Sequence, residues 1–123
     1  RIKAGLQQRL ELGSLEGRRD WGWAQDYVHG MWLMLQQEAV DDFILATGRL
    51  HSVRDVVRVA FEAVDLDWSD YVDHDAALVT AVEPASLCGN PGKAQRILGW
   101  RNTVPFEEII RRMVLHEQQK IPT

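Results

Sequence analysis

The balance between helical and strand-like segments most constrains the fold of this chain. Four segments carry the apolar repeat of an α-helix, whereas the strand-like runs are short and number only two or three. In residues 23–37, Val28, Met31, Trp32 and Leu35 fall at the i, i+3, i+4 and i+7 positions of one apolar stripe. So few strands cannot build a large sheet, and their edges need a partner. The sequence therefore predicts an α/β fold that is mostly helical.

Capping residues mark the ends of the other three helices. Ser52, with Asp55 three residues later, resembles a capping box that begins one helix. A shorter helix follows Asn90, which can cap it, and stops at Gly99. The last helix enters near Pro105, because proline is favoured in a first helical turn.

The strand-like pieces are less regular. Leu10 and Leu12 precede a glycine and predict a short strand that enters a turn. The run 41–48 holds consecutive apolar residues, which is typical of an inner strand covered on both faces. Residues 65–89 are irregular, and so long a connection predicts a functional or mobile loop.

Charge and cysteine content exclude some classes of protein. The formal net charge of −4 argues against a broad surface for nucleic acid, and no apolar run reaches the ~18–20 residues that span a bilayer. Cys88 is the single cysteine, which fits a reducing cytoplasm, and we expect it to be a small buried hydrophobe. The chain opens on Arg1 and begins partway through an element, so we expect a larger N-terminal body outside it.

Two adjacent arginines, Arg18 and Arg19, stand just before the first helix. A guanidinium presents a planar fork of donors that matches phosphate oxygens, and a helix N-terminus adds a partial positive charge. This combination is suited to a diphosphate. The alternative is a salt bridge from an arginine to Glu16, Asp20 or Asp26, which is the commoner role of a surface arginine.

Motifs for cofactors and metals are missing from the sequence. It contains neither G-x-G-x-x-G nor G-x-x-x-x-G-K-[ST], the glycine-rich loops that cradle nucleotides, and no Tyr-x-x-x-Lys pair. None of the four histidines has a partner at the spacing of a known metal motif. These are His29, His51, His74 and His116. We therefore expect no metal and no cofactor on this chain alone.

The blocks "GSLEGRRDWGWAQDYVHGMWLMLQQ", "DDFILATG", "HSVRD" and "NPGKAQRILGW" share one resemblance. Together they resemble the C-terminal part of GDP-mannose 4,6-dehydratases, which are extended short-chain dehydrogenase/reductase enzymes. The match covers almost the whole chain, and its spacings agree without large gaps. The resemblance implies that residues 1–123 form the substrate-binding portion of an extended Rossmann-type enzyme.

A two-part enzyme is what this resemblance implies. In the family the N-terminal Rossmann part binds NADP and carries the Ser/Thr-Tyr-Lys catalytic set, and the C-terminal part holds the GDP-sugar. The enzyme converts GDP-mannose to GDP-4-keto-6-deoxy-mannose. A chain equivalent to the second part has no catalytic residue of its own, so we expect it to be inactive alone. The partners implied are a GDP-sugar and either a homo-oligomer or a complementary Rossmann chain, with neither nucleic acid nor membrane.

Family binding residues map onto three positions of this chain. Arg19 matches the arginine that contacts the nucleotide, and Trp21 then fixes its loop. Ser14 takes the place of a family asparagine, and Glu83 matches a family glutamate. A second nucleotide-binding arginine is replaced by Thr80. Losing such an arginine typically costs about 2–5 kcal/mol, which predicts weak binding. A GDP-sugar-binding module without chemistry and a diverged structural remnant are the alternatives.

Overall fold

The computed structural model describes residues 1–79 and 86–121 of the chain. These residues form four α-helices, two short 3-10 turns and four short strands. In chain order they are β1 (Leu10–Leu12), β2 (Arg18–Arg19), α1 (Ala24–Leu35), β3 (His51–Ser52), α2 (Val53–Glu62), η1 (Trp68–Asp70), β4 (Val72–His74), η2 (Ala76–Leu78), α3 (Gly92–Leu98) and α4 (Phe106–Gln119). The predicted α/β class with four helices is confirmed, although the strands exceed the two or three that the sequence indicated.

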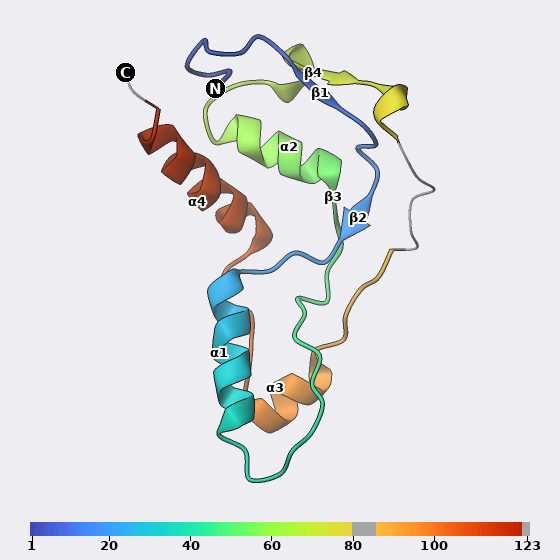
Figure 1. Cartoon of the computed structure of the whole chain (residues 1–123), viewed down its shortest axis with the longest axis vertical. Helices are drawn as coiled ribbons and strands as arrows, with labels where there is room; N and C mark the ends of the chain where they lie inside the picture. The colour runs from blue at the N-terminus through green and yellow to red at the C-terminus, as the bar shows by residue number, and fades with distance from the viewer. Residues whose placement is uncertain (80–85, 122–123) are drawn as a thin grey trace.

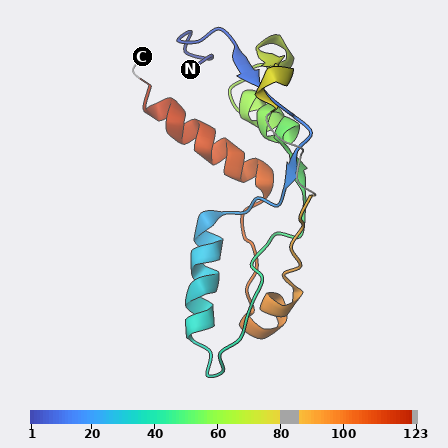
Figure 2. The ribbon, with the colours of Figure 1, turned by 45° about the vertical axis from the view of Figure 1, so that its right-hand side comes forward.

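The molecule is elongated, with a helix pair at each end (Figure 1). α2 packs against α4 at one end, and α1 packs against α3 at the other. Between the two ends, β2 pairs with β3 antiparallel, whereas β1 pairs with β4 in parallel beside α2 at the α2–α4 end. The turned view places β1 beside α2 and keeps α1 below α4 (Figure 2). The segment that joins β2 to α1 therefore runs between the two ends.

The core beneath α2 gathers around Leu15, Val57 and Phe61. The capping box predicted at Ser52 is confirmed: the Asp55 amide donates to Ser52 Oγ at 3.1 Å, and the Ser52 amide donates to Asp55 Oδ2 at 2.8 Å. This reciprocal pair fixes where α2 begins. It also joins the helix directly to β3.

The second core gathers around Ala94, Leu98 and Trp100. The Trp100 indole stacks on Tyr27 at 6.1 Å between ring centroids and donates from Nε1 to the Asp26 carbonyl at 2.6 Å. α3 ends as predicted at a glycine, because Gly99 adopts the left-handed φ of 67° that terminates helices. The predicted cap at Asn90 is wrong by one residue: Pro91 is the N-cap of α3, and Asn90, one residue earlier, accepts from the Gly92 amide at 2.9 Å.

The apolar stripe of α1 faces outward, although such a stripe usually indicates a core face. Val28, Met31, Trp32 and Leu35 are 62%, 58%, 54% and 82% exposed. The inward face is the one that carries Gly30, where an added Cβ would lie 2.6 Å from Leu45 Cδ1. Contacts made by distant segments, rather than the stripe itself, decide which side of α1 is covered.

Two further expectations are wrong. Residues 41–48 form no strand, because no segment of the described residues pairs with their backbone; side-chain bonds to Asp20 and Lys93 hold their two ends. Cys88 is exposed rather than buried, because it lies on an extended segment one residue before the packed Gly89. Within the described residues, no helix is long and apolar enough to cross a membrane.

Candidate functional site

Arg18 and Arg19 form the whole of β2, in register with Ser52 and His51 of β3. Both arginines are exposed. Arg19 donates from Nη1 to the Arg18 carbonyl at 2.7 Å, which leaves the rest of its donor fork turned to solvent. Among the residues that the structure describes, neither arginine forms a salt bridge.

The three carboxylates that could have neutralised this pair are occupied elsewhere. Glu16 pairs with Arg54 at the start of α2. Asp26 is buried and accepts from both the amide and the hydroxyl of Thr103, at 2.7 Å each. Among the described residues Arg19 therefore forms no local salt bridge, and its guanidinium remains available to bind an anion.

Asp20 is the third of these carboxylates, and it ties distant segments together. It accepts from the Thr47 amide at 2.9 Å and from the Thr47 hydroxyl at 2.5 Å. It also accepts from the Gly48 amide at 3.0 Å and the Gly89 amide at 3.4 Å. The loop around Arg19 is thereby fixed against residues 47–48 and 89. Sequence reasoning treated Asp20 only as a candidate ion-pair partner and missed this role.

Trp21 is packed rather than presented to a ligand. Its ring stacks on Phe106, the first residue of α4, with 5.9 Å between centroids. His51 stacks on the same phenylalanine at 3.8 Å with a 5° interplanar angle. β3 and the loop after β2 are therefore anchored on the start of α4, which supports the expectation that Trp21 fixes the loop.

Of the other predicted binding residues, only Ser14 lies within the described part of the chain. Ser14 is half-buried, and its Oγ accepts from the Glu16 amide at 3.2 Å, which shapes the turn between β1 and β2. Glu83 and the substituted position Thr80 lie outside the described residues. Ser14 therefore lies in the connection from β1 to β2, Arg19 is the last residue of β2, and the contribution of Glu83 stays a prediction.

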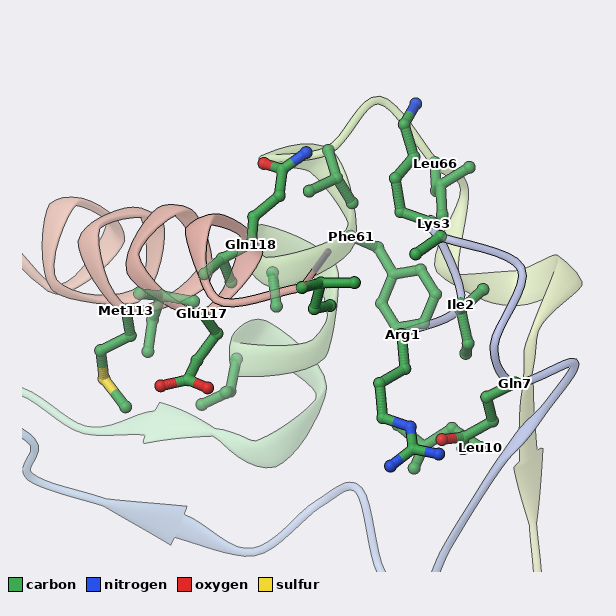
Figure 3. A pocket seen from close by; sticks show the side chains of 17 residues that line it. Arg1, Ile2, Lys3, Gln7, Leu10, Phe61, Leu66, Met113, Glu117 and Gln118 are labelled. Carbon is green, nitrogen blue, oxygen red and sulfur yellow. The ribbon is translucent and has the colours of Figure 1, made fainter. Parts of the chain in front are cut away.

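A cavity of about 880 Å³ lies away from these residues, between α2, α4 and the N-terminal segment. Figure 3 shows the Phe61 ring facing Ile2 and Leu10, with Met113 of α4 on the other side. Its lining is mainly apolar, and neither Arg19 nor Ser14 contributes to it. The cavity is suited to apolar side chains rather than to a diphosphate.

The described part of the chain contains no group of three or more His, Cys, Asp or Glu side chains that could hold a metal ion. Nor does it fit a dinucleotide cofactor. Such a cofactor needs a strand, a glycine-rich turn and a helix N-terminus in succession. In the described residues β1 leads to another strand, and β3 enters α2 directly through Ser52.

The chain is similar to known proteins in sequence and in fold. A family model described as GDP-mannose 4,6 dehydratase matches residues 1–113. GDP-mannose 4,6 dehydratase 2 of Arabidopsis thaliana is 46% identical over 114 residues, which is 93% of this chain and 31% of that protein. The GDP-mannose 4,6 dehydratase of Dictyostelium discoideum is 37% identical over 137 residues, covering 98% and 38%.

Among solved structures, RMD from Pseudomonas aeruginosa complexed with NADPH superposes with a TM-score of 0.86 at 18% identity. The superposition covers 98% of this chain and 40% of that one, and at this identity it reports on the fold alone. The chain thus spans about a third of the length of the curated relatives it matches.

Proposed function

This chain belongs to the GDP-mannose 4,6-dehydratase family, and from that premise we propose that residues 1–123 form the part of such an enzyme that holds the GDP-sugar. The relatives are dehydratases about three times as long. In this proposal the NADP-binding Rossmann part and the catalytic set lie outside this sequence. GDP-mannose is the substrate of the assembled enzyme, and GDP-4-keto-6-deoxy-mannose is its product.

The observation that carries the proposal is the exposure of the Arg19 guanidinium. Its guanidinium is exposed and has no carboxylate partner among the described residues, while its neighbour Asp20 is bonded to distant backbone segments. A cation on a fixed loop binds an anion with less loss of conformational entropy than one on a loose loop. Arg19 is therefore suited to contact the diphosphate, with Ser14 and Glu83 as further contacts on the sugar nucleotide.

NADP chemistry is not assigned to this chain. The described residues lack a strand, glycine-rich turn and helix in the order that a dinucleotide needs. A cofactor-binding part outside this sequence would hold NADP, which would supply the hydride chemistry. The contribution of this chain in that assembly is to bind and orient the sugar nucleotide through Arg19.

Calorimetric titration with GDP-mannose tests the binding role. We expect weak binding, with a dissociation constant of roughly 10–1,000 μM for the chain, and a further loss of at least tenfold, about 1.4 kcal/mol, in Arg19→Ala. Arg111→Ala is the matched control, because Arg111 is an exposed arginine on α4. Absence of heat at millimolar ligand, or equal weakening in both variants, would show that Arg19 is no nucleotide contact.

A further inference from the structure

We propose that His51 is a second contact for the diphosphate of the sugar nucleotide, so that Arg19 and His51 bind one anion from two paired strands. This inference rests on the proposed function, because it adds a residue to the same site. His51 is one of the histidines for which the sequence shows no metal motif. The structure gives its side chain a position that suits an anion.

The register of β2 and β3 brings the two side chains together. Arg19 is directly opposite His51 in this antiparallel pair. Figure 1 shows the two strands lying side by side. Directly opposite residues project from the same face of a ribbon, with their Cβ atoms roughly 4.5–5.5 Å apart. A guanidinium and an imidazole at that separation can both reach the oxygens of one diphosphate.

The charge of this short ribbon favours an anion. Its four residues carry three basic side chains and no carboxylate. Cations directly opposite each other repel, so a charged Arg19–His51 pair is less stable without an anion than with one. The carboxylate of α2 that interacts with His51 is Asp55, and its Oδ2 already accepts from the amide and the hydroxyl of Ser52 at 2.8 Å each. That carboxylate is therefore engaged in the helix cap.

The imidazole of His51 is held in place but keeps its hydrogen-bonding capacity. The residue is half-buried, and its ring stacks flat on Phe106 with 3.8 Å between centroids and 5° between the planes. Stacking covers the face of the ring, whereas the two nitrogens lie at its edge. Among the described residues these nitrogens have no hydrogen-bond or salt-bridge partner, and no buried side-chain nitrogen or oxygen is left without one. They therefore reach solvent, on a ring that is already ordered for binding.

Calorimetric titration of the 123-residue chain with GDP-mannose tests this contact. His51→Phe keeps a flat ring for the stack on Phe106 and removes both nitrogens. We expect about tenfold weaker binding in this variant, the effect of losing one charge-assisted hydrogen bond. His29→Phe is the matched control, because His29 is an exposed histidine that stacks on Trp32 of α1. It should bind GDP-mannose as tightly as the native chain.

The pH dependence of binding gives a second readout, because a histidine ordinarily gains its charge between pH 8 and pH 5. On the elements packed against His51, the neighbouring charged residues are Arg19 of β2, Asp55 of α2, and Glu107 and Glu108 beside Phe106 of α4. Arginine and carboxylate side chains ordinarily stay charged over this range. The diphosphate of GDP-mannose is esterified at both ends and also keeps its charge. Binding should therefore be tighter at pH 5 than at pH 8 in the native chain and in His29→Phe, but not in His51→Phe.

The outcomes separate this inference from the proposed function. If Arg19→Ala weakens binding while His51→Phe binds like His29→Phe at both pH values, only the role of His51 is overturned. If the native chain gives no heat at millimolar GDP-mannose, both proposals are overturned.

Nuclear magnetic resonance of the native chain needs no variant, so it applies even if His51→Phe does not fold. The imidazole ¹⁵N signals of His51 should shift on saturation with GDP-mannose, whereas those of His29 should not. A His51 signal that stays unchanged at saturation would overturn the contact.

Discussion

Arg19 and Asp20 are neighbours in the chain with opposite tasks. The arginine is exposed and keeps its donors available, whereas the carboxylate uses both oxygens to accept hydrogen bonds from residues 47–48 and 89. An arginine loop that lacked this anchor would have to be ordered on binding, which costs affinity. The aspartate of the Arg-Asp-Trp-Gly block is therefore as important to the candidate site as the arginine.

The substitution Asp20→Asn should reveal this anchoring. The amide side chain would keep one acceptor oxygen and would direct an NH₂ group at backbone donors, so the loss should be about 1–3 kcal/mol of unfolding free energy. Urea denaturation of the native protein and of Asp20→Asn measures this loss of unfolding free energy. Glu38→Gln makes the same chemical change at an exposed carboxylate with no hydrogen bond in the described residues, and should cost little. If the two substitutions lowered the unfolding free energy equally, the hydrogen bonds of Asp20 would make no net contribution to stability.

Helices of this chain differ in how well they could be predicted. The capping box of α2 was evident from Ser52 and Asp55, because it depends on residues three apart. The end of α3 could also be predicted locally, because a single residue, Gly99, terminates it. The orientation of α1 could not be predicted, because Leu45 and Trp100, which are distant in sequence, determine which face of the helix is covered. Sequence periodicity identifies an apolar stripe but does not say whether its partner is present.

The cap of α2 provides a stability prediction for that element. Ser52→Ala removes the oxygen that accepts from the Asp55 amide, and an N-cap serine contributes about 1 kcal/mol. Chemical denaturation followed by circular dichroism should show this decrease. Ser86→Ala changes an exposed serine and is the matched control. A Ser52→Ala variant as stable as Ser86→Ala would mean that water replaces the cap at no cost.

The same cap should make part of the stability depend on pH. Hydrogen bonds from the backbone and hydroxyl of Ser52 hold the pKa of Asp55 below its ordinary value of 3.8. Because the folded pKa is depressed, the contribution is present above pH 3.8 and is lost as pH falls through the folded value. The difference in unfolding free energy between the native protein and Ser52→Ala should therefore shrink below about pH 3.8. A constant difference across this range would contradict a role for the hydroxyl in stabilising the Asp55 anion.

At the scale of the whole molecule, family and fold class could be predicted, but the site only in part. The Arg-Asp-Trp-Gly and Met-Leu-Gln blocks identified the family because they are specific and their spacings agree, and the match over residues 1–113 confirms it. The site could not be completed, because Glu83 lies outside the described residues. The apparent strand at 41–48 was wrong because apolar composition does not reveal whether a neighbouring strand exists to pair with it.

The proposed division into a cofactor-binding part and a substrate-binding part predicts the catalytic behaviour of this chain. Incubated with GDP-mannose and NADP, the 123-residue chain should form no GDP-4-keto-6-deoxy-mannose, because no described residue offers a cofactor cradle. Mass spectrometry of the sugar nucleotides checks this result, with the full-length Arabidopsis relative as the positive control. Product formed by the chain alone would place catalytic residues within it and overturn the division.

The parallel pairing of β1 with β4 also has a consequence for synthesis of the protein. Leu10 is opposite Val72, so roughly half the chain separates the two strands. During translation β1 leaves the ribosome long before β4, and its backbone must stay solvated until the later strand is available. Pairing so distant in sequence is slow to nucleate, whereas the capping box that starts α2 joins residues only three apart. We therefore expect α2 to be ordered on the nascent chain before this small sheet closes.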